Sequence, residues 1–137
     1  MSRSGYSYDL DSWDLIRYRG AVASAIGGKR GQSLLIEMRD ALDAMRTKAL
    51  ITQELIQGGE VCALGCVGLN RGLDMTPVDP EDYGQIATLF GVSRALVREI
   101  ESVNDDDGFY KNETPGQRWV RVRKWVNSQI KATPLSK

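Results

Sequence analysis

The feature that most constrains the fold is an apolar repeat at helical spacing, which returns along the chain between residues typical of helix ends. The clearest case begins at Thr114, which can cap a helix, and Pro115, which suits the first helical position. Apolar side chains then recur at intervals of three and four residues, at Trp119, Val122, Val126 and Ile130. A helix with this pattern buries one stripe against its neighbours. The sequence therefore predicts a mainly α protein.

Four further segments have the same pattern, which gives about five helices. The first begins near Trp13 and ends at Gly27-Gly28, and the second carries its apolar residues between Leu34 and Met45. We expect these two to form an antiparallel helical hairpin, joined by a basic turn at residues 29–31. Asp79 and Pro80 predict the start of a helix that runs to Phe90. Ser93 predicts the cap of the next helix, after a turn at Gly91.

The stretch 49–69 allows two interpretations. Gly58-Gly59 is a turn signal, which favours a small β-hairpin centred on the two glycines. The following run, 61–69, is rich in small apolar residues and fits a short buried helix almost as well. Periodicity cannot separate a strand from a helix in so short a run.

The length of 137 residues indicates a single compact domain, 1–137, and its 42% of hydrophobic residues is ordinary for a globular protein. Within it we distinguish five parts. They are an N-terminal arm (1–12), the helical hairpin with its connection (13–57), a small-residue core segment (58–75), three C-terminal helices (79–131) and a tail (132–137).

The two helices predicted around Gly91 form a corner at 80–103 that resembles the helix-turn-helix of bacterial transcription factors. Ser93, Arg94 and Arg98 would then face the major groove of duplex DNA, with Arg121 and Lys124 of the last helix as phosphate contacts. Two glutamates beside Arg98, Glu99 and Glu101, weaken the positive potential that such a helix needs. A structural helical corner is the alternative interpretation, and the one that we favour.

Composition argues against an enzyme. The chain has 18 basic residues, 18 acidic residues and no histidine, which excludes histidine-based triads and histidine-containing zinc sites. Cys62 and Cys66 alone cannot complete a structural zinc site, so we expect two buried thiols. No catalytic residue, cofactor or metal is predicted.

Three groups of residues are candidates for contacting a protein partner. Aromatic anchors are Tyr6, Tyr8 and Trp125, because tyrosine and tryptophan are enriched in binding surfaces. Charged candidates are the basic pair Lys29 and Arg30 and the acidic run Asp105, Asp106 and Asp107. Oligomeric state is left open, with a homodimer among the options.

The most apolar segment, 61–69, is far shorter than the ~20 residues that span a bilayer. No apolar run follows the N-terminus, as a secretory signal would require. We therefore expect no membrane association and a cytoplasmic location.

Several segments are similar to a family of small proteins from phages and prophages of proteobacteria. The likeness is strongest in residues 6–26 and continues through four shorter motifs: GKRGQ (28–32), GEVCALG (59–65), ETP (113–115) and QRW (117–119). Gly27 departs from the larger residue expected in relatives. The resemblance implies a non-catalytic phage accessory protein in the cytoplasm of a bacterial host cell. Its expected partner is a host or phage protein, and inhibition of a host defence or regulatory system is the expected effect. A helix-turn-helix regulator that binds duplex DNA is the alternative.

Overall fold

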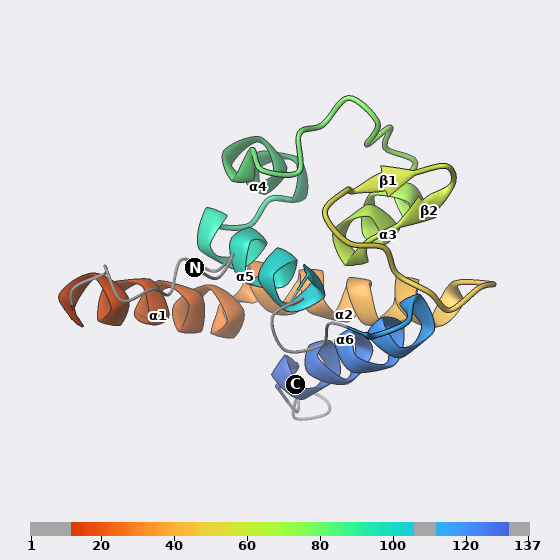
Figure 1. Ribbon diagram of the computed structural model, residues 1–137. Helices are drawn as coiled ribbons and strands as arrows, with labels where there is room; N and C mark the ends of the chain where they lie inside the picture. Colours follow the sequence, from red (N-terminus) through yellow and green to blue (C-terminus); the bar gives the residue numbers. More distant parts are fainter. Residues whose placement is uncertain (1–11, 106–111, 132–137) are drawn as a thin grey trace, which may run out of the picture.

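The computed structural model describes residues 12–105 and 112–131, and within them the chain is mainly α, as predicted (Figure 1). It holds a small antiparallel sheet of β1 (Ile56–Gln57) and β2 (Glu60–Val61) beside the helices. The helices are α1 (Ser12–Gly27), α2 (Lys29–Ala44), α3 (Ala63–Asn70), α4 (Tyr83–Phe90), α5 (Arg94–Asp105) and α6 (Pro115–Gln129).

The predicted antiparallel hairpin of the first two helices is wrong. Only Gly28 separates α1 from α2, whereas an αα-hairpin needs a loop of ~2–5 residues. Figure 1 shows α1 leading into α2 in the same general direction. The predicted basic turn is also wrong, since Lys29 and Arg30 form the first turn of α2. The junction requires Gly31, because a Cβ atom there would lie 1.8 Å from the carbonyl oxygen of Ala25.

Helix α2 is the shared support of the fold, with α3 on one side and α6 on the other (Figure 1). Its apolar stripe includes Leu35, Met38 and Leu42, all fully buried. Helix α6 is held to it by Trp119, whose indole Nε1 donates to the carbonyl oxygen of Leu42 over 3.1 Å. The N-terminus of α6 has the predicted Thr114 cap, completed by Gln117 as a capping box. These contacts replace the predicted pairing of α2 with α1.

The structure contains both elements predicted for 49–69: the β-hairpin comes first, and the short buried helix follows it. Gly58 and Gly59 have φ of 59° and 84°, which suits the tight turn between β1 and β2. Helix α3 follows directly, and the Sγ atom of its N-cap residue Cys62 accepts from the amide of Gly65 over 3.4 Å. Six of the eight residues of α3 are buried. Both cysteines are buried and unpaired with each other, as expected.

The predicted helical corner is confirmed, with two shifts at its ends. Helix α4 begins at Tyr83 and is capped by Asp82 rather than Asp79, because residues 80 and 81 form a turn. Gly91 has φ of 71° and ends α4 in the left-handed conformation that favours glycine. Ser93 caps α5 by accepting from the amide of Leu96 over 3.2 Å. Helix α5 then continues to Asp105, the first residue of the acidic run.

Candidate functional site

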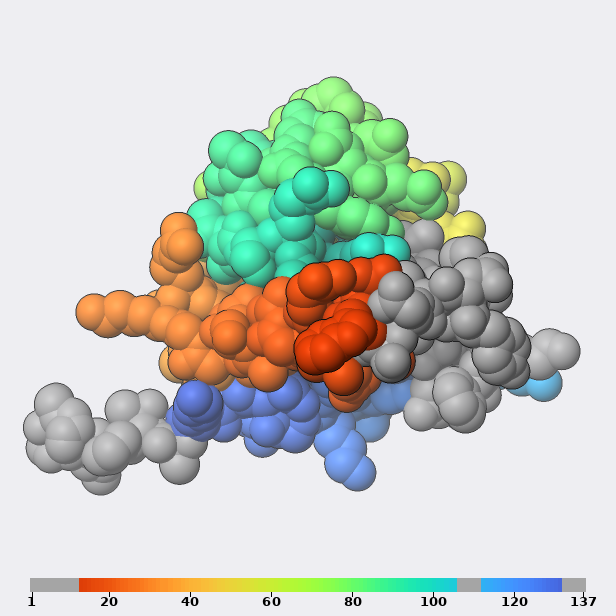
Figure 2. Space-filling view, turned by 90° about the vertical axis from the view of Figure 1, so that its left-hand side faces the viewer, coloured from red at the N-terminus to blue at the C-terminus, as the bar shows by residue number. Residues whose placement is uncertain are grey.

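A groove of about 370 Å³ opens between α1, α5 and α6. Figure 2 shows α1 end-on, with α5 above it and α6 below. Nine residues line this groove: Arg19, Val22, Ala23, Ile26, Gly27, Glu99, Trp125, Gln129 and Lys131. A second cavity, beside Cys62 and Asn104, has a volume of about 10 Å³, which is enough for one water molecule and too small for a ligand.

Helix α1 supplies one wall of the groove because its lining residues recur at intervals of three and four. Val22 is buried and Ile26 is half-buried, so both form an apolar floor. Trp125 completes this floor from α6, where it is half-buried against the core. An apolar floor with an aromatic ring is the usual composition of a binding groove.

Charged side chains surround this floor. Glu99 enters from α5, and burial raises the pKa of its carboxyl group, opposed by the charge of Arg19 and by the hydroxyl of Tyr18. Lys131 lies at the other end, where a Cβ atom on Gly27 would come within 2.9 Å of its Nζ. The groove thus combines an apolar floor with one carboxylate and two cations.

Of the residues predicted to contact a protein, three remain accessible at or beside this groove. Trp125 lines it directly. Lys29 and Arg30 are exposed in the first turn of α2, next to the end of α1. Tyr6, Tyr8, Asp106 and Asp107 lie outside the described residues, so their predicted role is not addressed by the structure.

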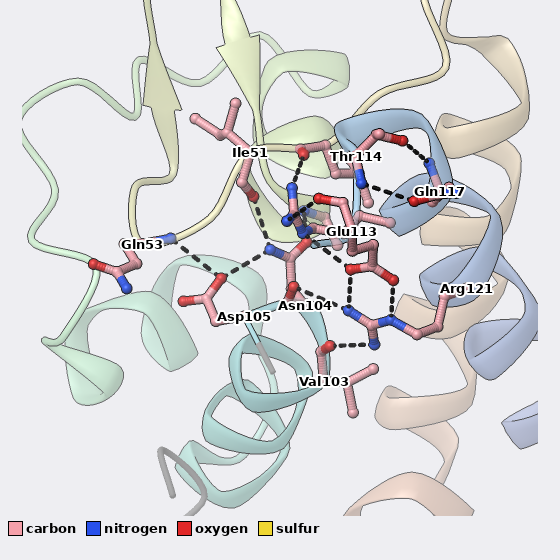
Figure 3. A network of polar contacts seen from close by, with 12 residues as sticks. Ile51, Gln53, Val103, Asn104, Asp105, Glu113, Thr114, Gln117 and Arg121 are labelled. Atoms are coloured by element: carbon pink, nitrogen blue, oxygen red, sulfur yellow. Dashed lines mark hydrogen bonds and ion pairs between the residues drawn. The ribbon is translucent and has the colours of Figure 1, made fainter. Parts of the chain in front are cut away.

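Asp105 is not a surface contact, and here the prediction is wrong. It is only 5% exposed and lies in a network of polar contacts at the end of α5 (Figure 3). Its Oδ1 accepts from the amide of Gln53 over 3.2 Å and from Nδ2 of Asn104 over 2.9 Å. Asn104 is 1% exposed, and its side chain also bonds Ala63 and Ile51. The two side chains therefore hold α5 against the segments before and after the β-hairpin.

Arg121, predicted to contact a phosphate, belongs to the same network. Its guanidinium binds both carboxylate oxygens of Glu113, over 2.7 and 3.0 Å, and donates to the carbonyl oxygen of Val103 over 2.7 Å (Figure 3). The Glu113 side chain is only 8% exposed and also pairs with Arg118. Arg121 therefore joins the N-terminus of α6 to α5, whereas Lys124, the other predicted phosphate contact, is exposed.

The remaining DNA-contacting candidates lie on the helical corner. Ser93 and Arg94 are exposed at the start of α5. Arg98 is half-buried, and its guanidinium stacks on two rings, 5.4 Å from the centroid of Tyr18 and 5.9 Å from that of Tyr83. From Ala95 to Asp105 no residue of α5 is exposed, because α1, α3, α4 and α6 all pack against it. A recognition helix needs a free face, and α5 presents only its first turn.

The cysteines are poor nucleophiles. Burial raises the pKa of the Cys62 thiol to about 12 and that of the Cys66 thiol to about 11, so both are protonated at neutral pH. Across 12–105 and 112–131, no three His, Cys, Asp or Glu side chains come together in a way that could hold a metal ion. In the same residues, no helix is long and apolar enough to cross a membrane.

Sequence reasoning missed most of the groove. Trp125 was identified, but Arg19, Ala23, Gln129 and Lys131 were not, since their convergence depends on how α1 and α6 meet. No family model matches the chain, and neither a curated protein nor a solved structure shows significant similarity to it.

Proposed function

We propose that the chain is a non-catalytic accessory protein of a bacteriophage that binds a protein of the host or of the phage. Inhibition of a host defence or regulatory system is the consequence that we favour. The groove between α1, α5 and α6 is the observation that carries the proposal. It offers an apolar floor of Val22, Ile26 and Trp125 with charged groups around it, and such a surface suits an amphipathic segment of another protein.

Two further observations support a binding role. The resemblance of residues 6–26 to phage and prophage proteins supplies the biological context. The chain has no histidine, and both of its cysteine thiols are protonated at neutral pH, so the usual nucleophile–base pairs are not available. Two exposed cations, Arg19 and Lys131, line the groove, and Lys29 and Arg30 are exposed in the first turn of α2. This positive potential favours an acidic partner surface.

The test is affinity capture from phage-infected cells with a tagged chain and two matched variants. Ala23→Arg places a long cation in the groove, whereas Ala21→Arg makes the same change on the same helix, outside the groove. Both alanines are exposed, so both variants keep the fold.

We expect the wild-type chain and Ala21→Arg to capture the same protein, and Ala23→Arg to lose at least ten-fold in yield. Equal capture by both variants would remove the groove from the proposal. Failure of the wild-type chain to retain any stable protein partner would reject the proposal as a whole.

Duplex DNA is the alternative ligand, and the exposed Arg94 at the start of α5 is the observation in its favour. On this alternative the chain shifts duplex DNA in a salt-dependent way, and Arg94→Ala lowers the slope of log affinity against log salt by about one. Glu81→Ala, a change at an exposed acidic position outside the corner's second helix, is the control. No shift of duplex at low salt would exclude DNA.

A further inference from the structure

Glu99 is the residue of the groove whose hydrogen bonding is incomplete in the single chain. It is the one acid among the described residues that line the groove. Its Oε1 atom is buried and has no hydrogen-bond partner in the described part of the chain. A buried oxygen without a donor is costly when it carries charge, and the cost falls when the carboxyl group is protonated. The groove therefore holds a carboxyl group whose protonation depends on what covers it.

The groups that face Glu99 across the groove are mostly basic or neutral. Burial raises the pKa of Glu99, and the charge of Arg19 and the hydroxyl of Tyr18, both on α1, oppose that rise. Helix α6 and the segment after it contribute Trp125, Gln129 and Lys131, of which only Lys131 is charged. The cations of the groove are thus the groups that favour an ionised Glu99.

The other charged side chains on this part of α5 face different elements. The guanidinium of Arg98 stacks on Tyr18 and on Tyr83 of α4. Glu101 and Asp105 line the small cavity beside Cys62, at the N-terminus of α3. None of these side chains lines the groove. Glu99 is therefore the α5 acid that a molecule in the groove would cover.

The charge of the groove indicates an acidic occupant. Arg19 and Lys131 are both exposed, so their charges are accessible beside the apolar floor. The position of Lys131 is fixed by its own amide, which donates to Oε1 of Gln32 over 2.8 Å. A segment with apolar side chains on one face and carboxylates beside them matches both the floor and the cations.

Such an occupant acts on Glu99 in three ways. It covers the groove and removes water from the carboxyl group. Its carboxylates pair with Arg19 and Lys131, which then stabilise an ionised Glu99 less. Its negative charge also repels an ionised Glu99. Each of these effects raises the pKa of Glu99, and a fully buried glutamate can reach a pKa of ~8–9.

We propose that the groove binds an acidic amphipathic segment of the partner protein and that Glu99 takes up one proton from solvent as the segment binds. This inference rests on the protein-binding function proposed above. The proton neutralises the Glu99 carboxylate, and no other group of the groove changes its charge. Binding is therefore tightest at low pH and weakens as the pH rises through the pKa that Glu99 has in the complex.

The test uses the protein that the wild-type chain retains from phage-infected cells at pH 6. Its binding to the wild-type chain, Glu99→Gln and Glu60→Gln is measured by titration calorimetry at pH 6 and pH 8. Glu60, an exposed acid in the β-hairpin, is the matched control. We expect wild type and Glu60→Gln to bind at least ten-fold more tightly at pH 6, with proton uptake shown by a binding enthalpy that depends on the buffer. Glu99→Gln, which is neutral at every pH, should bind equally at both and take up no proton.

The acidic character of the occupant is tested by charge reversal on α1. Arg19→Glu reverses a cation of the groove, whereas Arg17→Glu makes the same change at an exposed position of the same helix, outside the groove. We expect Arg19→Glu to weaken binding at pH 6 at least ten-fold and Arg17→Glu to leave it within about two-fold of wild type. Tighter binding by Arg19→Glu would identify a basic occupant and overturn the proposal.

The possible failures are distinguishable from one another. Retention of no protein partner at either pH would reject the binding function and this inference together. A partner that binds wild type equally at pH 6 and pH 8 would leave the binding function in place and overturn the inference. A pH dependence that persists in Glu99→Gln would overturn it as well, because another group would then take up the proton.

Discussion

Helices α1 and α3 differ in how they are used, although both are rich in small and apolar residues. In α3, six of eight residues are buried, and a neighbouring backbone touches Gly65 directly. In α1, Val22 is the one buried residue between Trp13 and Gly27, and a Cβ atom at Gly20 would meet nothing within 4 Å. The same residue types thus fill the core in one helix and remain on the surface in the other. Small residues on α3 serve the fold, and most of those on α1 remain on the surface.

The largest expected effect tests the α3 side of this comparison. Gly65→Ala would place a Cβ atom 1.8 Å from the carbonyl oxygen of Leu55, and backbone on both sides cannot move apart cheaply. We expect the free energy of unfolding, measured with urea, to fall by about 3 kcal/mol or more. Gly68→Ala is the control, since its clash is with the flexible Met75 side chain and its loss should be smaller. Equal losses would mean that the tight packing of α3 is not specific to Gly65.

The polar network at the end of α5 should give the next largest effect. Arg121→Ala leaves the Glu113 carboxylate, only 8% exposed, with Arg118 as its remaining cation. We expect a loss of about 2–3 kcal/mol in the free energy of unfolding, because a buried charge loses its best partner. Lys124→Ala, at an exposed position on the same helix, should change it by less than about 0.5 kcal/mol. A similarly small change in Arg121→Ala would show that the contacts of Arg121 with Glu113 do not stabilise the fold.

The pH dependence of the free energy of unfolding tests whether Glu99, in the groove, is desolvated. Burial raises the pKa of Glu99 above its ordinary value of 4.5, so the folded state holds this proton more tightly than the unfolded state. The stability that this proton contributes is present at low pH and is lost as the pH rises from 4.5 through the raised pKa.

We expect Glu99→Gln, which stays neutral, to lose less stability than wild type between pH 4.5 and pH 7 in urea unfolding. Glu60→Gln, at an exposed position in the β-hairpin, should keep the wild-type profile. Parallel profiles for wild type and Glu99→Gln would show that Glu99 is not desolvated by the groove.

The smallest expected effect has the opposite sign. Gly20→Ala adds a methyl group in open space and improves helix propensity, so the free energy of unfolding should rise by about 0.5–1 kcal/mol. The measurement is urea unfolding. Together with the loss in Gly65→Ala, this gain would show one substitution acting in opposite directions in the two helices. A loss of stability in Gly20→Ala would remove the contrast.

Local signals were sufficient where a structure depends on neighbours in sequence. Thr114 with Pro115 predicted the start of α6, and Gly58-Gly59 predicted the turn of the β-hairpin, because a cap and a tight turn are set within four residues. The start of α4 was missed by three residues, since Asp79 and Asp82 are equally suitable caps by composition. In the structure Asp79 accepts from the amide of Glu81, two residues on, and so closes a turn, whereas Asp82 accepts from the amide of Gln85 and caps the helix.

Long-range contacts explain the other errors. Asp105 looks like part of a solvated acidic loop, yet its partner Gln53 is 52 residues away. Arg121 looks like a free cation, yet it binds Glu113 and the last turn of α5. The groove itself requires α1, α5 and α6 to be placed together, and no local pattern carries that information.

The side chain of Gln32 helps to fix the direction of α1 relative to α2 and α6. Its side-chain nitrogen donates to the carbonyl oxygens of Ile26 and Gln129, over 2.7 and 3.0 Å, and its Oε1 accepts from the amide of Lys131. One carboxamide therefore fastens the end of α1 and the end of α6 to the first turn of α2. Because Gly28 is the single residue between α1 and α2, this side chain helps to set the angle between the two helices. Its removal would leave each helix formed while changing the angle at which α1 meets a partner.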